Sequence, residues 1–268
     1  MSPAPLFSIV TVCLNCKDKL IITAQSVLAQ TFNNFEYIIK DGASTDSTEK
    51  ILGKIGADLI VSSKDSGIFD GMNKAINLSS GRYIYFLNAG DVFVDQHVLH
   101  DVAAEIQKHP DVELFYGDII SPRSKRKYIF YKKKITRYQL YTSTVCHQAW
   151  FLSRSVYLQN GGFDATQQIG GDYLLLLRII LEQKIRTRHI RRFVAIYEGG
   201  GVSADPILVK RSEKWRQEAR DGIFPRIEAR VYSLVWYMGN LMKRLTYDRV
   251  LFRIYRRWCH LRFVIRGK

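Results

Sequence analysis

A chain of 268 residues is long enough to bury a substantial core, so we expect one large domain or one domain with an appendage. Its hydrophobic fraction of 47% and charged fraction of 24% exclude a collagenous or low-complexity chain. The formal net charge of +15 favours polyanionic partners, which are nucleic acid, an anionic membrane surface or a phosphate-bearing substrate.

The positive charge is concentrated in two segments. Residues 123–137 hold eight Lys or Arg and no acid, and residues 243–268 hold nine with Asp248 as their one acid. No segment reaches the roughly 18–20 apolar residues of a membrane span. The N-terminus does not read as a secretory signal, and the few cysteines fit a reduced compartment, so we expect a cytoplasmic protein. Cys13 and Cys16 have CxxC spacing and are either a redox pair or two small buried or half-buried thiols beside a strand end.

The first half of the chain alternates strands with helices. Apolar runs without polar alternation predict buried parallel strands, and amphipathic or capped segments predict helices between them. The predicted strands are residues 7–14, 35–40, 58–62, 82–87 and 112–119, and the predicted helices are residues 17–30, a segment from about 46, 69–78 and 96–108. This order predicts an α/β domain built on a mainly parallel, Rossmann-like sheet flanked by helices.

The second half is less regular. The basic residues 123–137 are a loop or a hairpin, "HQAWFLSRSVY" is a strand followed by a helix start, and "NGGFD" is a tight turn. "GDYLLLLRIILEQ" predicts a helix, residues 187–197 a strand, and "EGGGVS" a flexible loop. After Pro206 the chain is helical and increasingly basic. We therefore expect a domain at 1–205 and a basic, aromatic helical extension at 206–268.

Polar residues follow several of the predicted strands directly. Asn15 follows the first strand, Asp41 ends the second, and residues 88–91 follow the fourth. Ligands of such sheets bind at the carboxyl ends of the strands. Neither a GxGxxG after the first strand nor a GxxxxGK[ST] occurs, which argues against a dinucleotide dehydrogenase and a P-loop NTPase.

Five segments in order resemble the landmarks of family 2 glycosyltransferases of the GT-A fold, over roughly residues 6–205. They are "FSIVTVCLN", "IIKDGASTDST", "SSKDSGIFDGMNKAINLSSGRYIYFLNAGD", "HQAWFLSRSVYLQNGGFD" and "GGDYLLLLR". They are most similar to bacterial members that build exopolysaccharide, colanic-acid-type and O-antigen repeat units. The resemblance implies an inverting glycosyltransferase that uses a nucleotide-sugar donor, with a UDP-sugar favoured.

The resemblance also implies donor-binding roles for individual residues. Asp41 matches the carboxylate that recognises the base, Lys64 and Asp65 match the segment that closes over the nucleotide, and Asn73 matches a polar position near the diphosphate-sugar. The full expected donor-binding set is Thr11, Asn15, Asp41, Lys64, Asp65, Asn73, Asn88, Ala89, Gly90 and His147.

Residues 88–91 occupy the place of the family's DXD motif, with Asp91 as its last carboxylate. A carboxylate beside a diphosphate implies a divalent cation, Mn²⁺ or Mg²⁺, and Asp91 is the expected metal ligand. The usual first acid is Asn88 here and the middle acid is Gly90, so the expected metal site is reduced to one carboxylate.

Asp172, in "GGDYLL", matches the family's general base. Inverting transfer needs one carboxylate to take the proton of the acceptor hydroxyl, whereas a hydrolase of glycosides would use two. Asp172 begins a predicted helix, so a helix cap is the alternative interpretation. His147 is expected to line the sugar pocket, and a structural role is its alternative.

The basic, aromatic C-terminal region suits the surface of an anionic cytoplasmic leaflet. It agrees with a glycan or polyprenyl-diphosphate-linked acceptor and with a peripheral location at the inner membrane. A solvated helical face whose aromatic residues pack on the main domain is the alternative. Two other functions remain open: a nucleic-acid-binding protein, and a catalytically inactive homologue that binds nucleotide-sugars. With the transferase interpretation, no nucleic acid is expected as a partner.

Overall fold

The structure is a computed structural model that describes residues 4–122, 126–128, 135–201 and 205–245. Its contacts divide the chain into two units. The first comprises Met1–Lys134 and Val145–Ser212, and the second comprises Ile135–Thr144 and Glu213–Lys268. The domain boundary expected at residues 205 and 206 stays a prediction.

The first unit is built on one sheet, which has nine strands within the described residues. Its order is β3-β2-β1-β4-β8-β6-β9-β5, and β7 pairs with β6. The strands are β1 (Phe7–Cys13), β2 (Phe35–Asp41), β3 (Leu59–Ser62), β4 (Tyr83–Phe86), β5 (Val92–Phe93), β6 (Leu114–Ser121), β7 (Arg126–Tyr128), β8 (Trp150–Ser153) and β9 (Thr187–Ile196).

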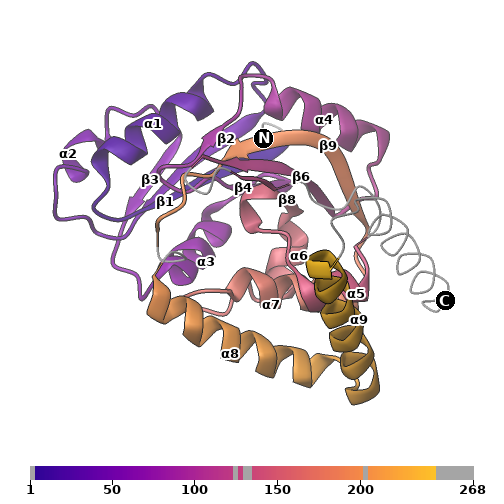
Figure 1. The fold of residues 1–268 in the computed structure, drawn as a ribbon. Helices are drawn as coiled ribbons and strands as arrows, with labels where there is room; N and C mark the ends of the chain where they lie inside the picture. Colours follow the sequence, from indigo (N-terminus) through magenta and orange to yellow (C-terminus); the bar gives the residue numbers. More distant parts are fainter. Residues whose placement is uncertain (1–3, 123–125, 129–134, 202–204, 246–268) are drawn as a thin grey trace. The chain divides into compact units, whose positions relative to one another are not determined.

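Helices cover both faces of this sheet. In Figure 1, α1 and α4 lie along one face, and α3, α6 and α7 lie along the other. The helical segments of the chain are α1 (Lys17–Leu28), α2 (Glu49–Leu52), α3 (Ile68–Leu78), α4 (Val98–Lys108), α5 (Arg137–Thr142), η1 (His147–Ala149), α6 (Arg154–Gln159), α7 (Gly171–Leu177), the π-helical η2 (Arg178–Glu182), α8 (Pro206–Ile223) and α9 (Arg226–Leu245).

The buried strands behave as their composition predicts. Every residue of β1 and β4 is buried, and β1 pairs in parallel with both β2 and β4. Continuous apolar strands are stable only when helices cover both faces, which is the arrangement observed. The mainly parallel sheet flanked by helices is therefore confirmed. The carboxyl ends of β1, β2 and β3 meet at one edge of the sheet, because Cys13 pairs with Asp41 and Asp41 pairs with Ser62.

The centre of the sheet departs from a purely parallel arrangement. β8 runs antiparallel to both β4 and β6, while β9 is parallel to β6. The hairpin interpretation of the basic segment is confirmed for β7, which pairs antiparallel with β6, while residues 123–125 and 129–134 lie outside the described part. The helix expected from about residue 46 is the short α2, which begins at Glu49.

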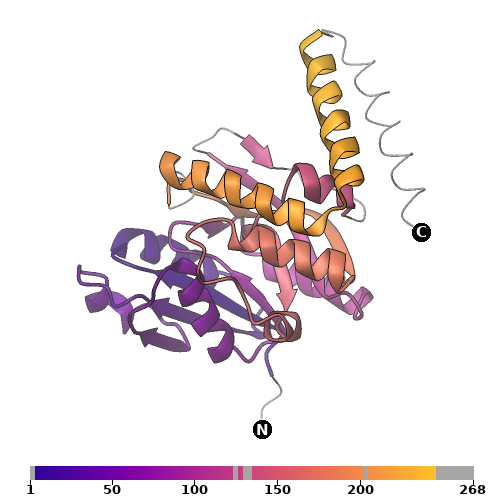
Figure 2. The ribbon, with the colours of Figure 1, turned by 90° about the horizontal axis from the view of Figure 1, so that it is seen from below.

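The second unit is a small helical assembly around aromatic side chains. Tyr141 packs against Phe224 and Tyr232, with ring centroids 5.3 Å and 5.5 Å away. Arg137 on α5 forms two hydrogen bonds of 2.7 Å with the carboxylate of Glu228 on α9. Aromatic packing and a bidentate ion pair together hold the six-residue α5 to the long helix α9, the yellow helix of Figure 2.

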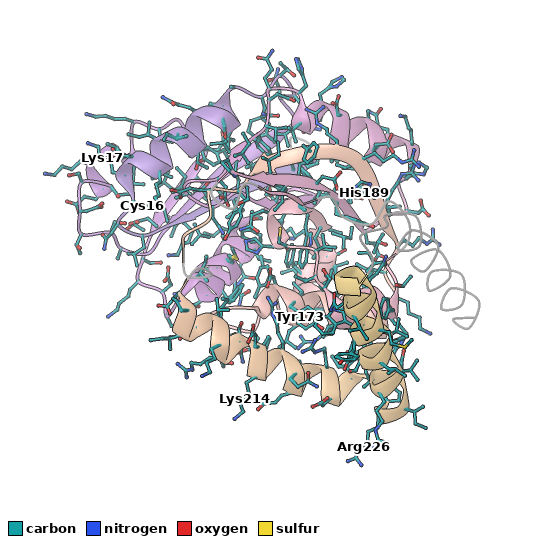
Figure 3. The ribbon with its side chains drawn as sticks, viewed as in Figure 1. Cys16, Lys17, Tyr173, His189, Lys214 and Arg226 are labelled. Atoms are coloured by element: carbon teal, nitrogen blue, oxygen red, sulfur yellow. The ribbon has the colours of Figure 1, made fainter. Side chains whose placement is uncertain are left out.

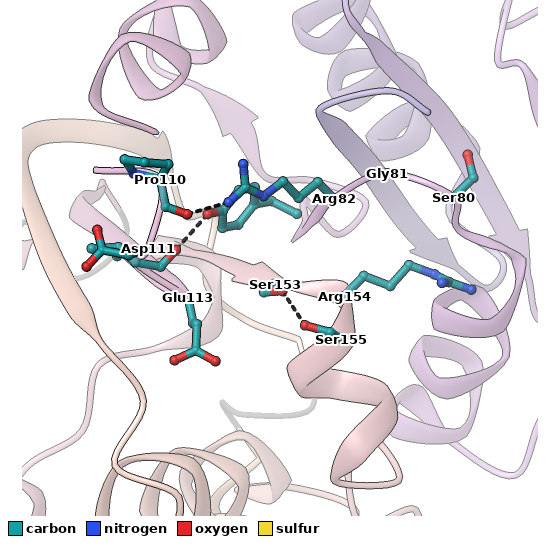
Figure 4. A pocket seen from close by; sticks show the side chains of 11 residues that line it. Ser80, Gly81, Arg82, Pro110, Asp111, Glu113, Ser153, Arg154 and Ser155 are labelled. Carbon is teal, nitrogen blue, oxygen red and sulfur yellow. Dashed lines mark hydrogen bonds between the residues drawn. The ribbon is translucent and has the colours of Figure 1, made fainter. Parts of the chain in front are cut away.

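A hollow of about 370 Å³ lies at the amino end of β4, the edge of the sheet opposite the carboxyl ends. Figure 4 shows Arg82, Pro110, Glu113, Ser153 and Arg154 around it. Two arginines and two acids are among the residues that line it, and Arg82 donates to the carbonyl of Pro110. None of the residues expected to bind the donor lines this hollow.

Candidate active site

The first polar cluster at the carboxyl edge surrounds Asp41 at the end of β2. Its carboxylate accepts hydrogen bonds from the Ser44 N–H at 3.0 Å, the Ser44 hydroxyl at 2.5 Å and the Ser62 hydroxyl at 2.6 Å. The thiol of Cys13 also donates to it, at 3.7 Å. Burial raises the pKa of Asp41, but the hydrogen bonds from Ser44 and Ser62 outweigh burial and hold its pKa below the ordinary value. Asp41 is thus an ionised, fully buried carboxylate.

The same cluster contains a lysine with no exposed surface, Lys40. Its ammonium donates to the carbonyls of Asp41 at 2.7 Å and Ser63 at 2.6 Å, and it lies 3.3 Å from a carboxylate oxygen of Asp65. A buried ammonium is tolerated when it is paired and hydrogen-bonded in this way. Lys40 therefore ties the ends of β2 and β3 to the segment that carries Asp65. We call Lys40, Asp41, Ser44, Ser62 and Asp65 the Asp41 cluster.

Asn15 fastens the loop after β1 to this cluster. Its backbone has a positive φ of 49°, and its side-chain oxygen accepts the N–H of Thr45 at 2.8 Å. Cys16 and Lys17 mark the passage from β1 into α1 (Figure 3). Asn15 and Lys64 are both exposed at this edge, beside the Asp41 cluster. The structure thus brings four of the expected donor-binding residues to one place, namely Asn15, Asp41, Lys64 and Asp65.

The turn after β4 is held by one face of α1. Thr23 accepts the N–H of Gly90 at 2.9 Å and donates to the carbonyl of Asp91 at 2.7 Å. One and two turns further along, Ser26 accepts the N–H of Phe93 and Gln30 donates to the carbonyl of Asp95. This spacing is that of a single helix face. The polar face of α1 therefore fixes the path of the chain from the turn into β5.

Asp91 is buried within its own turn, with 4% of its surface exposed. One carboxylate oxygen accepts the backbone N–H of Glu198 at 3.0 Å, and the Gln148 side chain also bonds to the carboxylate. Burial raises the pKa of Asp91 to about 7. As placed, this carboxylate connects the turn to the chain that follows β9.

Asn88, His147 and Asp172 form a second polar cluster, which we call the Asp172 cluster. The Asn88 amide nitrogen lies 3.2 Å from Nε2 of His147, and Nδ1 of His147 lies 3.2 Å from the Asp172 carboxylate. The carboxylate can only accept, so Nδ1 carries the proton and Asn88 donates to Nε2. The side-chain oxygen of Asn88 is then buried and has no hydrogen-bond partner in the described part of the chain.

Asp172 lies in the first turn of α7, next to Tyr173, which Figure 3 labels. The residue at the N-cap position is Gly170, with a left-handed φ of 85°, and it makes no side-chain cap. The Asp172 carboxylate accepts the N–H of Tyr173 at 2.9 Å, and its side chain is 13% exposed. Asp172 is therefore not the N-cap residue, although its carboxylate does accept an N–H of the first turn. Its carboxylate reaches solvent and is oriented by His147.

Two of the expected donor-binding residues are used inside the protein. Thr11 is fully buried and its hydroxyl donates to the carbonyl of Leu87 at 2.8 Å. Asn73 donates to the carbonyl of Phe163 and accepts the N–H of Phe163, both at 2.8 Å. Asn73 thereby holds the turn at Gly162, where φ is 75°. The donor-binding roles of both residues stay predictions, and the structure joins neither to the two clusters.

Other residues of the site were not predicted from the sequence. Lys40 reads as an exposed residue at a strand end, and Thr23 reads as an ordinary helix residue. Glu198 and Lys19 are 179 residues apart in sequence, yet their side chains form an ion pair at 2.8 Å. The sequence indicates a place for Glu198 at the site only through its position in the "EGGGVS" loop. No local pattern indicates that Lys19 lies at the site.

The turn after β4 offers few of the ligands that a divalent cation requires. Mg²⁺ and Mn²⁺ prefer carboxylate, carbonyl and water oxygens. Asn88 and Gly90 contribute no carboxylate, and Asp91 is buried with its oxygens hydrogen-bonded. Within residues 4–122, 126–128, 135–201 and 205–245, no three His, Cys, Asp or Glu side chains lie together so as to hold a metal ion. The side chains described at the turn therefore do not fit a cation site as they stand.

Comparison with known sequences identifies the family. Residues 8–161 match the profile of Glycosyl transferase family 2. The chain belongs to this family. It is 31% identical over 208 residues to a PGL/p-HBAD biosynthesis glycosyltransferase of Mycobacterium bovis, covering 75% of this chain and 80% of that one. The Escherichia coli enzyme named UDP-Glc:alpha-D-GlcNAc-diphosphoundecaprenol beta-1,3-glucosyltransferase WfaP is 37% identical over 100 residues, which are 36% of this chain and 40% of WfaP.

Solved structures show the same fold. S. aureus TarS 1-349 in complex with UDP-GlcNAc superposes with a TM-score of 0.68 at 16% identity, covering 88% of this chain and 72% of that one. Mannosyltransferase PcManGT from Pyrobaculum calidifontis, in complex with GDP-Man and Mn2+, superposes with a TM-score of 0.65 at 14% identity, covering 89% and 71%. The GT-A type of the fold is thus confirmed. The chain is a glycosyltransferase of family 2, and the charge-based alternative of a nucleic-acid-binding protein gains no support.

Proposed function

We propose that this glycosyltransferase moves a sugar, with inversion, from a nucleotide-sugar to a hydroxyl of a glycan or polyprenyl-diphosphate-linked acceptor in bacterial surface polysaccharide synthesis. UDP-sugars are the favoured donors, since the E. coli relative is named for UDP-Glc and the TarS structure is a complex with UDP-GlcNAc. The observation that carries the proposal is the Asp172 cluster, in which a solvent-accessible carboxylate is linked through His147 to the turn after β4.

Asp172 acts as the general base in the proposed reaction. Its carboxylate takes the proton of the acceptor hydroxyl while that oxygen attacks the anomeric carbon of the donor. The bond from the anomeric carbon to the diphosphate breaks on the opposite side, so the configuration inverts. His147 keeps the carboxylate oriented by donating its Nδ1 proton to one oxygen, at 3.2 Å.

Asn88 supplies a contact to the donor. Its side-chain oxygen is a buried acceptor without a partner among the described residues, and such an atom carries a free-energy cost until a donor reaches it. A hydroxyl of the ribose or of the transferred sugar would satisfy it. This contact would break no hydrogen bond within the described chain. The oxygen has no partner there, and the amide nitrogen of Asn88 would keep its bond to His147. On the other side of the edge, the exposed Asn15 and Lys64 are the proposed contacts to the nucleotide.

A metal-dependent reaction was expected from the resemblance, with Asp91 as the ligand. The PcManGT structure is a complex with Mn2+ as well as GDP-Man, which supports that expectation. Because the described side chains at the turn do not fit a cation as they stand, no proposed step runs through one. Nucleotide titrations in Mn²⁺ and in EDTA decide the question.

A peripheral location at the inner membrane is supported by the second unit. On α9 the side chains at Ile227, Val231, Leu234, Met238 and Leu241 are all exposed, by 41% to 79%. Their spacing of four and three residues places them on one helix face. Lys243, Arg244 and seven further Lys or Arg follow along the chain up to Lys268. An apolar helix face that is followed in the sequence by basic residues suits an anionic lipid surface, where a lipid-linked acceptor would also reside.

None of the helices in the described residues has both the length and the apolarity that crossing a membrane requires. Flotation with vesicles of phosphatidylglycerol or of phosphatidylcholine tests the proposed surface contact. We expect binding to the anionic vesicles only, and weaker binding of Leu234→Asp than of Asn240→Asp, which makes the same charge change outside the apolar face. A dimer that Leu234→Asp dissociates, without any vesicle binding, would contradict the membrane proposal.

The transfer itself is tested by activity and product stereochemistry. UDP-Glc, UDP-GlcNAc, UDP-Gal and GDP-Man are each incubated with a synthetic polyprenyl-diphosphate-linked sugar, with and without Mn²⁺, and nucleoside diphosphate release is measured. We expect one donor to be consumed and the new linkage, read by NMR, to be inverted. Binding of a donor without release under any condition would favour the inactive homologue. A retained configuration would exclude Asp172 as the base of a single displacement.

A further inference from the structure

The turn at residues 88–91 presents no positive charge of its own to a diphosphate. Its one acid, Asp91, is 4% exposed and bonded to the backbone of Glu198, and Asn88 and Gly90 are uncharged. A departing nucleoside diphosphate carries two or more negative charges, which a transferase has to balance. Given the proposed function, another group near the turn has to provide the positive charge, either as a cationic side chain or by binding a metal ion.

Lys19 lies directly beside the turn. It is one helical turn before Thr23, on the polar face of α1 that also carries Ser26 and Gln30, and these three side chains bond to residues 90–95. A Cβ built on Gly90 would come within 3.4 Å of Cδ of Lys19. The side chain of Lys19 is 46% exposed. Among these four residues of the polar face, Lys19 is nearest the start of the helix and is the one that carries a charge.

Glu198 keeps Lys19 in this place. Its carboxylate lies 2.8 Å from the Lys19 ammonium, and a Cβ at Gly90 would collide with it. Gly90 has a φ of 103°, so the turn requires glycine both for its backbone and for the room that Glu198 occupies. An ion pair between side chains exposed by 46% and 42% is weak, so it can be exchanged for another anion at little cost.

We propose that Lys19 is a donor-binding residue that exchanges the carboxylate of Glu198 for the diphosphate of the nucleotide-sugar. The proposal rests on the proposed function of this edge of the sheet. Lysine binds phosphate as a point charge, and the first turn of a helix adds the positive end of the helix dipole. Lys19 occupies the third position of α1, inside that first turn. The Glu198 side chain is 42% exposed, so its carboxylate has room in solvent to move aside.

Calorimetric titration with UDP, GDP, dTDP and CDP, each beside its nucleoside, tests the exchange in EDTA and in Mn²⁺. Lys19→Met is compared with Lys108→Met, since Lys108 is also an exposed lysine in an ion pair, with Glu105 at 2.9 Å. We expect Lys19→Met to weaken binding of the diphosphate about tenfold or more in EDTA while the nucleoside binds as in wild type. Lys108→Met should bind both as wild type does.

Glu198→Gln provides the opposite change. It removes the competing charge but leaves the backbone N–H that Asp91 accepts, so we expect tighter binding of the diphosphate. Unchanged diphosphate affinity in Lys19→Met would overturn the inference while the proposed function stands. Binding that requires Mn²⁺ and ignores Lys19 would overturn it in favour of a cation at Asp91. If wild type binds none of the four nucleotides, the proposed function fails first and the inference with it.

Discussion

The Asp41 cluster and the Asp172 cluster lie in the same unit and are both built from polar side chains, but they differ in how their atoms are satisfied. The carboxylate of Asp41 accepts from four donors and has no exposed surface. In the Asp172 cluster the carboxylate of Asp172 is 13% exposed, and the oxygen of Asn88 has no partner among the described residues. The carboxylate of the first cluster is satisfied within the chain, whereas the second cluster keeps a buried acceptor that the proposed donor would satisfy.

This difference suggests that the Asp41 cluster fixes the path of the chain, whereas the Asp172 cluster can take part in the reaction. A fully satisfied buried network stabilises one arrangement of the chain, and removing a member leaves charged or polar groups unpaired. The Asp172 side chain is partly exposed and is oriented by His147 and by the N–H of Tyr173, so its carboxylate is placed to meet a substrate hydroxyl. Because Asp41 has no exposed surface, its expected role in recognising the base would be exerted through the shape that it gives to the surrounding loops. The expected role of Asp172 requires direct contact with the substrate. Substitutions in the two clusters should accordingly affect different measurements.

Asp172→Asn gives the largest expected effect. The amide cannot accept the proton of the acceptor hydroxyl, so we expect kcat to fall by about 10³-fold, within the range measured for lost general bases. Donor affinity should change little. The free energy of unfolding should fall by about 1–2 kcal/mol, because the amide has one oxygen and can accept from either Tyr173 or His147, which bond to different oxygens of the carboxylate. The check is kcat beside the thermal midpoint, with Asp111→Asn as control, since Asp111 is an exposed carboxylate in an ion pair with Arg186. An equal loss of kcat in the control would contradict a catalytic role.

Asp41→Asn should show the reverse pattern, with stability as the main effect. The amide turns an NH₂ group toward hydroxyl and N–H donors, so we expect the free energy of unfolding to fall by about 2–4 kcal/mol. Asp46→Asn, at an exposed position of the same loop, should cost less than about 1 kcal/mol. Urea unfolding monitored by tryptophan fluorescence measures both. A loss of activity at unchanged stability would instead give Asp41 a direct role in binding.

The pH dependence of stability tests independently whether the ionised carboxylate of Asp41 stabilises the fold. Burial raises the pKa of this carboxyl, but the hydrogen bonds from Ser44 and Ser62 lower its pKa below the ordinary value. The stabilisation is therefore fully present above the unfolded pKa of about 3.9 and is lost as the pH falls through the folded value. Wild type should lose its advantage over Asp41→Asn below about pH 4.

The sequence predicted the parts of this edge that depend on local pattern. Unbroken apolar runs indicated the parallel strands, and polar residues directly after them indicated the edge where Asn15, Asp41 and Asn88 lie. It did not predict β5, because two residues form a strand only by pairing with β9. It also did not predict the burial of Lys40, whose ammonium is accepted by carbonyls and a carboxylate brought together by folding. Contacts between residues far apart in sequence, such as Lys19 with Glu198, leave no periodic signal.

His147→Gln should have an intermediate effect on rate. Glutamine can still donate to one partner, but it cannot reproduce the two ring nitrogens that join Asn88 to Asp172. We expect kcat to fall by about 10- to 100-fold, less than in Asp172→Asn, and the pH profile of kcat to shift because the imidazole no longer supports the carboxylate. His100→Gln, an exposed histidine on α4, is the matched control. A change in KM alone would place His147 in donor binding without a role in orienting Asp172.

Asn88→Ala gives the smallest expected effect and sharpens the contrast most directly. Removing the side chain deletes a buried oxygen that has no partner in the described chain, but it also deletes the amide nitrogen that bonds to His147. The two effects oppose each other, so the free energy of unfolding should change by less than about 1 kcal/mol. Donor affinity should fall by about fivefold to tenfold, since one neutral hydrogen bond to a hydroxyl is lost. Thermal unfolding without ligand, followed by calorimetry with the donor that is consumed, measures both quantities. A free protein that is as stable as wild type, with a weakened complex, would show that the oxygen of Asn88 serves the ligand more than the fold. A destabilised free protein with unchanged donor affinity would instead make Asn88 a structural partner of His147, as Ser44 and Ser62 are of Asp41.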